Sequence, residues 1–339
     1  MRYCIWNNKG GVGKTFLSFC FAIEYAINNP EKNIVAVDMC PQANLSEMIL
    51  GGSVNGQENQ KSLQEEGLTV ADYIKKRSLT SSMSKLGNET TYFIKAHNYN
   101  KTMPENLTLL CGDMDLDLCS QLINYMGSAP IQGAWRNSRS LLLDLLQTYE
   151  SNSKKETVFF IDCNPSFSAY TQMAILSSDN IIIPCTADFA SIRGIDNVFV
   201  TLYGFRDTES KETPFGIIDF SSEVSKNGMQ LPKVHSFILN KSRTKDSKAT
   251  KAYAANAQKI SDMVSNYTKA SPESFIDTQR EMVFNIKDGN NLVLVLNHDG
   301  LPLSEMSSGK HIVYGEETQV NQGQLDALKS DMELVIDSL

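Results

Sequence analysis

Short runs of apolar residues alternate along this chain with longer segments in which apolar residues recur every three or four positions. The first pattern predicts buried β-strands and the second predicts amphipathic α-helices. The expected strands are residues 3–6, 33–37, 107–111, 157–161, 181–184 and 234–239. The expected helices are residues 15–28, 114–125, 138–149 and 324–338, with two more that begin at Ile192 and Lys248. This alternation favours an α/β fold, a doubly wound and mostly parallel sheet with helices on both faces.

Two segments show neither pattern. Residues 51–67 are polar and rich in glycine, which indicates a mobile insertion or an ordinary solvated loop. Residues 205–232 are expected to form a long irregular connection. We expect a single domain over residues 1–339 and, because a glycine loop begins within the first ten residues, no helix-turn-helix domain ahead of it.

Composition excludes several classes of protein. Hydrophobic residues make up 41% of the chain and charged residues 21%, which is enough for a sizeable core and excludes wholesale disorder. A net charge of −8 means that any contact with nucleic acid must come from a local patch. The seven cysteines lack metal-binding spacing, so we expect small buried residues in a reducing cytoplasm. No apolar run is long enough for a signal peptide or a membrane span.

The segment Lys9–Thr15 reads KGGVGKT and lies between the first expected strand and the first expected helix. Its glycines let backbone N–H groups surround a phosphate, and the helix that follows adds its positive end. Lys14 can then reach the β- and γ-phosphates, and the hydroxyl of Thr15 can hold Mg²⁺. The general pattern asks for glycine where this chain has Asn8, so the segment alone could also be a tight strand-to-helix turn.

Two later expected strands end in aspartates, Asp38 and Asp162. The carboxyl ends of parallel strands meet at one edge of a sheet, so both carboxylates should lie beside the glycine loop. Carboxylates in that position can hold the water shell of Mg²⁺. The combination favours a nucleotide site over a plain turn.

Three motifs in this order resemble the ParA/MinD family of P-loop ATPases, whose phosphate loop is called a deviant Walker A motif. They are Lys9–Thr15, the VDMCPQAN segment at residues 37–44 and the FIDCNPS segment at residues 160–166. The resemblance extends with gaps from residue 2 to about residue 330. It implies the P-loop NTPase fold, ATP and Mg²⁺ as cofactors, and a homodimer that sandwiches ATP.

The resemblance also implies a role for individual residues. Lys9 would reach across the dimer to the partner's nucleotide, and the catalytic set would be Lys9, Lys14, Asp38 and Cys40. The metal set would be Thr15, Asp38 and Asp162. The nucleotide-binding set would be Lys9, Gly10, Gly11, Val12, Gly13, Lys14, Thr15, Phe16, Pro184 and Asn240. Asn240 could contact the adenine ring or could equally cap a turn.

Cys40 is a departure from the family pattern. The second motif usually reads Asp-x-Asp-Pro, and its second aspartate helps to orient the attacking water, whereas this chain reads Asp38-Met39-Cys40-Pro41. A neutral thiol is a poor hydrogen-bond acceptor, and a thiolate beside a triphosphate is disfavoured by like charge. We therefore expect slow ATP hydrolysis, unless another residue or the substrate phosphate itself takes over.

Two branches of the family fit less well than the ParA branch. MinD-like members end in a basic amphipathic helix on the membrane, whereas residues 324–339 carry four acidic residues against Lys329. Anionic lipid would repel such a helix. A redox ATPase of the iron-protein type is the weakest alternative, because the cysteines lack its paired spacing. Pro41–Gln42 and the stretch after Pro184 resemble ParA most closely.

A local excess of positive charge agrees with the ParA branch. Residues 236–259 contain six basic residues and one acidic residue in an otherwise acidic chain. ParA-like proteins bind DNA nonspecifically, and such a patch suits phosphate backbones, although it could also be a solvated helix face. The expected DNA-binding residues are Lys241, Arg243, Lys245, Lys248 and Lys251.

The sequence thus predicts a cytoplasmic, nucleoid-associated ParA-type ATPase. In its ATP-bound dimer it would bind DNA and, with a ParB-like centromere-binding or adaptor protein, drive partition of a plasmid or chromosome. The alternative is a hydrolysis-impaired, ATP-dependent scaffold or positioning switch for a cargo other than DNA. Neither function involves a membrane.

Overall fold

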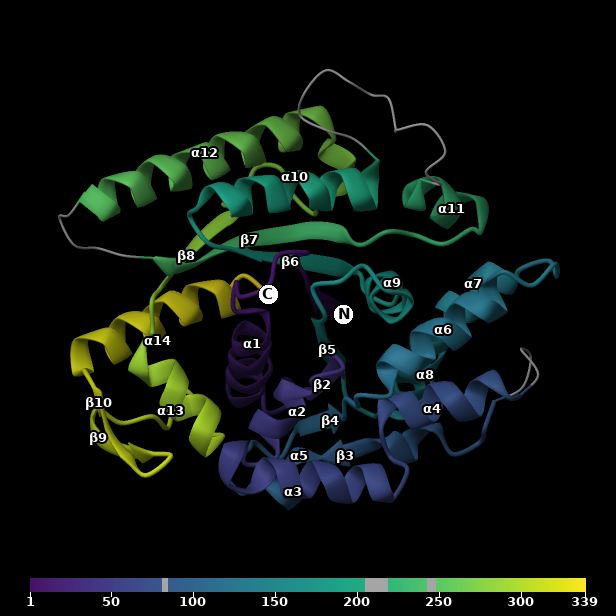
Figure 1. Ribbon diagram of the computed structural model, residues 1–339, viewed down its shortest axis with the longest axis horizontal. Coiled ribbons are helices and arrows are strands. Elements are labelled where there is room, and N and C mark those ends of the chain that lie inside the picture. The colour runs from purple at the N-terminus through teal and green to yellow at the C-terminus, as the bar shows by residue number, and fades with distance from the viewer. Residues whose placement is uncertain (81–84, 205–218, 243–247) are drawn as a thin grey trace.

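Eight strands form one central sheet in the order β3-β4-β2-β5-β1-β6-β7-β8 (Figure 1). This computed structural model describes residues 1–80, 85–204, 219–242 and 248–339. The strands are β1 (Arg2–Ile5), β2 (Asn33–Met39), β3 (Phe93–Lys95), β4 (Leu107–Leu110), β5 (Thr157–Cys163), β6 (Asn180–Cys185), β7 (Lys233–Ser242) and β8 (Val283–Lys287). All neighbouring strands are parallel except β3, which pairs with β4 in the antiparallel sense.

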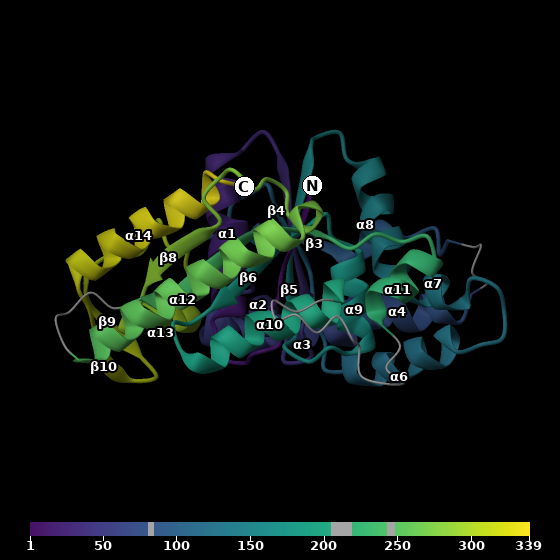
Figure 2. The same ribbon diagram turned by 90° about the horizontal axis from the view of Figure 1, so that it is seen from above.

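Helices cover both faces of the sheet, as Figures 1 and 2 show. One face carries α1 (Lys14–Asn28), α2 (Asn44–Ile49), α3 (Gly52–Glu65), α5 (Ala96–Tyr99), α13 (Asn291–Asp299) and α14 (Gln322–Ile336). The other face carries α4 (Val70–Ser78), α6 (Leu116–Gly127), α7 (Ala134–Arg139), α8 (Leu141–Asn152), α9 (Ala169–Leu176), α10 (Phe189–Tyr203), α11 (Phe220–Lys226) and α12 (Lys248–Ala270).

Alternation of side chains along the strands produces these two layers. In β2, Ile34 and Ala36 belong to the hydrophobic cluster under α1, whereas Val35 and Val37 belong to the cluster on the opposite face. Strands that are covered on both faces read as continuous apolar runs, which is how these strands are visible in the sequence. The expected doubly wound, mostly parallel α/β fold is confirmed.

The expectation of a loop at residues 51–67 is wrong, because most of this segment is helix α3. The helix is held by close backbone packing and not by an apolar stripe. A Cβ at Gly56 would lie 2.1 Å from the carbonyl oxygen of Glu47, and one at Gly52 would lie 2.3 Å from the carbonyl oxygen of His298. Leu63 is the one large side chain of α3 that is buried. A helix that packs through glycines lacks the apolar period from which helices are predicted.

The expected irregular connection at 205–232 is described only in part. Residues 205–218 lie outside the described residues, and the remainder contains helix α11. The pattern did not predict several further elements, among them the edge strand β3. Others are strand β8 at the other edge of the sheet and the hairpin of β9 (Gly309–Val313) and β10 (Glu316–Val320).

All seven cysteines are buried free thiols, as expected for small apolar residues. None of the helices in the described parts of the chain is long and apolar enough to cross a membrane. The acidic helix α14 packs its apolar side chains, including Leu325, Leu328 and Met332, into the core. Its apolar face is therefore already occupied.

Candidate nucleotide site

The glycine loop connects β1 to α1 at the carboxyl edge of the sheet. Gly11 and Gly13 adopt left-handed backbone conformations, with φ of +73° and +89°. The positive φ at Gly13 favours glycine, and a Cβ there would also displace the side-chain amide of Asn240, whose Nδ2 would lie 2.1 Å away. The loop is tied to β6 because Asn7 donates from Nδ2 to the carbonyl of Pro184 at 2.7 Å.

Lys14 lies folded across this loop. Its Nζ donates to the carbonyl oxygens of Asn7 at 3.0 Å and Lys9 at 2.8 Å. Burial lowers the pKa of Lys14, and the nearby carboxylate of Asp162 opposes that shift. The structure thus holds a desolvated ammonium at the loop, where a phosphate would be bound.

Lys9 is bound within its own chain by the segment that leads into α10. Its Nζ contacts both carboxylate oxygens of Asp188 at 2.8 and 2.6 Å, and the hydroxyls of Thr186 at 2.9 Å and Ser191 at 3.0 Å. We call Thr186, Asp188 and Ser191 the lysine clamp. The side chain of Lys9 is 23% exposed, so solvent still reaches this ion pair.

Asp188 also caps α10. Its Oδ1 accepts from the backbone N–H of Ser191 at 2.8 Å. Burial opposes its ionisation, but hydrogen bonds from Lys9, Thr186 and Ser191 outweigh burial and hold the pKa of Asp188 at about 2. The clamp therefore keeps its negative charge over the whole physiological pH range.

Asp162 lies at the end of β5 and faces the first turn of α1. Its Oδ2 accepts from the hydroxyl of Thr15 at 2.8 Å, and its Oδ1 accepts from the hydroxyl of Ser18 at 3.0 Å. In the sheet, Asp38 is its direct neighbour across the β2–β5 pair. Burial raises the pKa of Asp162, and the charge of Asp38 raises it further.

Asp38 is fully buried and held by the start of α2. Its Oδ2 accepts from the backbone N–H and hydroxyl of Ser46 at 2.9 and 2.8 Å, and its Oδ1 accepts from the N–H of Cys40 at 3.1 Å. Burial raises the pKa of Asp38 despite these hydrogen bonds. Gly112 leaves room for this carboxylate, because a Cβ there would lie 2.8 Å from Cγ of Asp38.

Two adjacent buried carboxylates and the Thr15 hydroxyl form a set of hard oxygen donors, which suits Mg²⁺. Among the described residues, no three His, Cys, Asp or Glu side chains come together as a complete metal site. Mg²⁺ is usually held through one or two carboxylates together with waters and substrate phosphates. The residues present therefore fit a magnesium–nucleotide complex better than a protein-only metal site.

Cys40 lies beside these carboxylates as a neutral thiol. Burial and the nearby charge of Asp38 raise the pKa of Cys40 to about 12. Its sulfur accepts a long hydrogen bond, 3.7 Å, from Nδ2 of Asn164. Cys40 is 9% exposed, so only a small part of it reaches the surface of the site.

Asn240 braces the glycine loop in this structure. Its Nδ2 donates to the carbonyl of Val12 at 3.0 Å, and its Oδ1 accepts from the N–H of Lys241 at 2.8 Å. These contacts correspond to the capping role considered from the sequence. Phe16, in the first turn of α1, is buried in the hydrophobic core.

The expected DNA-binding residues are only partly described. Arg243 and Lys245 lie outside the described residues, and Lys248 begins α12. Lys241 is exposed with a left-handed φ of 59°, and its Nζ lies 3.5 Å from the carbonyl of Gly11. Lys251 is exposed on α12. The structure thus brings Lys241 close to the glycine loop.

Helix α10 contacts both the residues at the start of the glycine loop and α12. On one side, a Cβ at Gly194 would lie 3.2 Å from Oδ1 of Asn7. On the other side, Asp196 accepts from the hydroxyl of Tyr267 of α12 at 2.6 Å. In addition, Asn256 of α12 donates to the carbonyl of Ala187, within the segment that carries the lysine clamp, at 3.3 Å.

Several residues of this site could not be identified from the sequence. Thr186, Asp188 and Ser191 follow a buried strand, but no motif connects them with Lys9. Ser18 and Ser46 are hydroxyl residues in helices, and nothing in the pattern marks them as partners of the aspartates. The only signal in the sequence that these residues belong to the site is their position after strands that carry or neighbour the motifs.

Comparison with known proteins places this geometry in a family. Residues 2–213 match the model of a family described as an AAA domain. An uncharacterized protein of Pseudomonas putida is 22% identical over 196 residues, which cover 58% of this chain and 60% of that protein. This chain thus aligns with less than two thirds of the length of that curated relative.

Solved structures share the fold at low sequence identity. Apo McdA of Cyanothece superimposes with a TM-score of 0.62 at 16% identity, covering 99% of this chain and 98% of that chain. A plasmid partition protein of Borrelia burgdorferi gives a TM-score of 0.51 at 15% identity, covering 100% and 98%. Cobyrinic acid a,c-diamide synthase of Mycobacterium smegmatis, with an ATP analogue and magnesium, gives 0.50 at 17% identity, covering 77% and 81%.

The family match spans more than half of the chain, and the motifs lie together at the carboxyl edge of a P-loop fold. The chain therefore belongs to the AAA domain family, and it is similar in its motifs and fold to ParA-like P-loop proteins.

Proposed function

We propose that this protein binds Mg·ATP, closes into a dimer that sandwiches two ATP molecules, and binds DNA nonspecifically in that state. With a ParB-like centromere-binding or adaptor protein, it would drive partition of a plasmid or chromosome in the cytoplasm. The observation that carries the proposal is the continuous set of contacts among Lys9, Lys14, Thr15, Asp38 and Asp162 at one edge of the sheet.

The proposed chemistry uses groups that are already positioned. Lys14 would exchange two backbone carbonyls for phosphate oxygens, and the N–H groups of residues 10–13 would donate to the same phosphates. Thr15 would turn its hydroxyl oxygen from Asp162 to the metal ion. Asp38 and Asp162 would then hold metal-bound waters, and Mg²⁺ would neutralise charge on the phosphates.

Lys9 is proposed to act on the nucleotide of the partner subunit. In this structure its ammonium is instead neutralised by the lysine clamp. Dimerisation would exchange the Asp188 carboxylate for a phosphate in the partner's site, which is a replacement of one anionic acceptor by another. The clamp thus supports a switch between an intramolecular and an intermolecular state of Lys9.

Replacing Lys14 with alanine is expected to weaken ATP binding by about one to three orders of magnitude, because a desolvated ammonium is lost from the phosphates. Isothermal titration with Mg·ATP measures this effect. Lys9→Ala is the matched control, because it removes a lysine from the same loop and should leave binding to the monomer nearly unchanged. Equal losses in both variants would contradict the separate roles of the two lysines.

Exposed lysines on α12 support the proposed DNA contact. Lys251 and Lys259 are exposed on this helix, and Lys241 lies near the glycine loop. DNA phosphates attract such cations without regard to sequence. The contact between Asn256 and Ala187 connects α12 to the lysine clamp, so nucleotide state and DNA contact have a physical route of coupling.

The double substitution of Lys251 and Lys259 by glutamate is expected to weaken DNA binding in the ATP state for all sequences alike. The salt slope should fall by about one unit for each phosphate-contacting cation that is removed. Fluorescence anisotropy with duplexes of unrelated sequence, at several salt concentrations, measures both effects. The control reverses Lys61 and Lys154, which are exposed outside α12. Unchanged affinity in the α12 variant would place the DNA site elsewhere.

A second function deserves a test because of Cys40. A thiol with its pKa raised to about 12 is a poor group for orienting water, so the ATP dimer could persist as a scaffold for a cargo other than DNA. Phosphate release per bound ATP, with and without DNA, separates the two functions. Turnover that DNA stimulates supports the partition ATPase, and its absence supports the scaffold.

A further inference from the structure

Helix α6 has a second apolar face that no described part of the chain covers. Leu116, Cys119 and Ile123 are buried in the core. Leu118 and Tyr125 point the other way and are 61% and 79% exposed, and Met114, in the turn before the helix, is 70% exposed. A helix with one core face does not need these residues for its own stability.

The exposed residues Met114, Leu118 and Tyr125 form a straight stripe with the half-buried Leu122. Leu118, Leu122 and Tyr125 are spaced at i, i+4 and i+7, so they lie on one side of α6 over about 10 Å. Met114 extends the stripe toward β4. We call Met114, Leu118, Leu122 and Tyr125 the α6 stripe.

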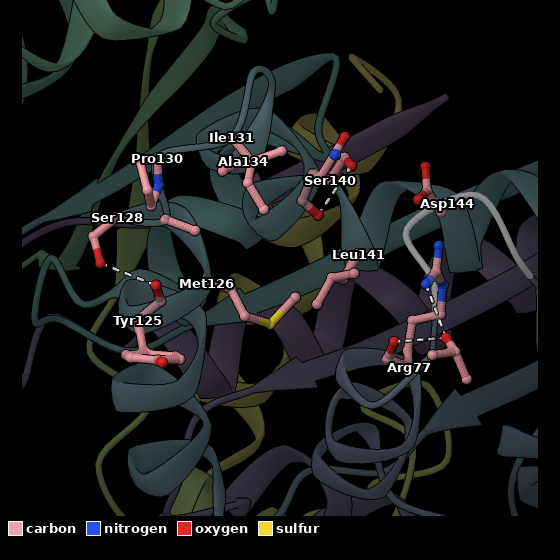
Figure 3. A pocket seen from close by; sticks show the side chains of 13 residues that line it. Arg77, Tyr125, Met126, Ser128, Pro130, Ile131, Ala134, Ser140, Leu141 and Asp144 are labelled. Carbon is pink, nitrogen blue, oxygen red and sulfur yellow. Dashed lines mark hydrogen bonds between the residues drawn. The ribbon is translucent and has the colours of Figure 1, made fainter.

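The stripe ends in a cavity of about 480 Å³. Figure 3 shows Tyr125, Met126, Ile131, Ala134 and Leu141 around it. These residues come from α6, α7, α8 and the α6–α7 turn and give the cavity an apolar side, whereas Arg77 and Asp144 also line it. A groove with a deep end of this kind fits a helix that carries one large apolar anchor at its end.

Charge identifies the kind of helix that would fit. Helix α6 contains no lysine or arginine, and its N-terminal end carries Asp117, which is exposed, close to Asp115. Asp115 is paired with Lys75, whereas Asp117 has no ion-pair partner among the described residues and accepts a hydrogen bond from the hydroxyl of Tyr170 at 3.2 Å. At the other end, Arg139 is buried and donates to the carbonyl of Ile123. The stripe is therefore apolar with a negative end.

We infer that the α6 stripe and its cavity bind an amphipathic helix of a partner protein, with apolar residues on one face and lysine or arginine opposite Asp117. A second copy of this chain fits less well, because α6 would bring its own acidic end and no basic residue. The inference rests on the proposed function for the identity of the partner, which would be the adaptor that acts on the ATPase.

A short path connects this surface to the nucleotide site. The stripe begins two residues after Gly112, whose N–H donates to the hydroxyl of Ser46 at 2.9 Å. The same hydroxyl donates to Asp38 at 2.8 Å. A partner that shifts the turn at Met114 would therefore act on a residue that holds Asp38 in place, which gives binding at α6 a route to ATP turnover.

The direct test uses a synthetic helical peptide of about 18 residues, with leucines at i, i+4 and i+7 and two lysines at one end. Its partner peptide carries glutamates in place of the lysines. The lysine peptide should bind the full chain, and Leu118→Ser should weaken binding at least tenfold. Leu334→Ser is the matched control, because Leu334 is 62% exposed on α14, far from the stripe in sequence and on the opposite face of the sheet.

Binding is read by fluorescence anisotropy without nucleotide, so failure here leaves the proposed ATPase function intact. Three results would overturn the inference: no binding of the lysine peptide, equal weakening by both serine variants, or equal binding of the glutamate peptide. Loss of the ATP-dependent dimer in Leu118→Ser would assign the stripe to a second copy of the chain instead. Since Leu118 is exposed, circular dichroism should show the variant folded.

Discussion

Replacing Cys40 with aspartate is expected to raise the single-turnover rate of ATP hydrolysis tenfold or more. The thiol is neutral, because burial and the charge of Asp38 raise its pKa to about 12. In the structure, the sulfur of Cys40 accepts a hydrogen bond from Nδ2 of Asn164 at 3.7 Å. Loss of a positioned general base costs about 10²- to 10⁴-fold in many enzymes, so restoring a carboxylate should recover part of that factor.

Cys40→Asn is the matched control for this gain, because it has the size of aspartate without its charge. It should leave the rate at the level of the natural chain. Binding of Mg·ATP to the aspartate variant has to be measured as well, because the substitution adds a carboxylate beside Asp38 and Asp162. Equal or lower hydrolysis in Cys40→Asp, with binding intact, would mean that another group orients the water.

The sheet could be predicted from the sequence because its strands are covered on both faces. Strands β2 and β5 are buried at every position, so they read as continuous apolar runs. Strand β8 is an edge strand with a mixed burial pattern, and β9 and β10 form a separate exposed hairpin. Such segments lack a distinctive period, which is why they could not be identified.

Helix α3 shows a different limit of sequence patterns. Its contacts are made by backbone at Gly52 and Gly56, so its stability comes from close approach to Glu47 and His298 and not from apolar side chains. Glycine in a helix normally argues against the helix. Only the tertiary structure shows why it is retained here.

The chemical groups of the site were predicted where a motif fixes their position. The structure places Lys14, Thr15, Asp38 and Asp162 together at one edge of the sheet. The lysine clamp was not predicted, because its residues lie far from Lys9 in sequence, and the resemblance of the stretch after Pro184 to ParA did not connect them with Lys9. Roles for individual residues, including Asn240 and the basic residues of α12, remain proposals for experiment.

Lys9→Ala is expected to abolish the ATP-dependent dimer while leaving ATP binding to the monomer nearly intact. In the monomer, Lys9 contacts residues of the clamp, and its Nζ does not take part in holding Lys14. The backbone carbonyl of Lys9, which Lys14 contacts, remains in the alanine variant. In the proposed dimer, the missing ammonium would leave phosphate charge at the interface without its partner. Breaking one buried charge pair in this way costs on the order of several kcal/mol of dimerisation free energy.

Asp188→Asn separates loss of the lysine from loss of the clamp. Asparagine can still cap α10, but it removes the negative charge that holds Lys9. This variant should dimerise with ATP at least as readily as the natural chain, because the ammonium of Lys9 no longer has to break an ion pair with Asp188. Loss of the dimer in both variants would indicate that the clamp is a structural ion pair and not a resting position for Lys9.

Sedimentation equilibrium of the natural chain in Mg·ATP, Mg·ADP and no nucleotide tests the central claim most directly. The account predicts the monomer mass of 37.7 kDa without nucleotide and with ADP, and twice that mass with ATP. It also predicts that Lys9→Ala stays at the monomer mass in all three conditions. A natural chain that remains monomeric at saturating ATP, or a Lys9→Ala variant that dimerises like it, would contradict an ATP-sandwich switch built on this lysine.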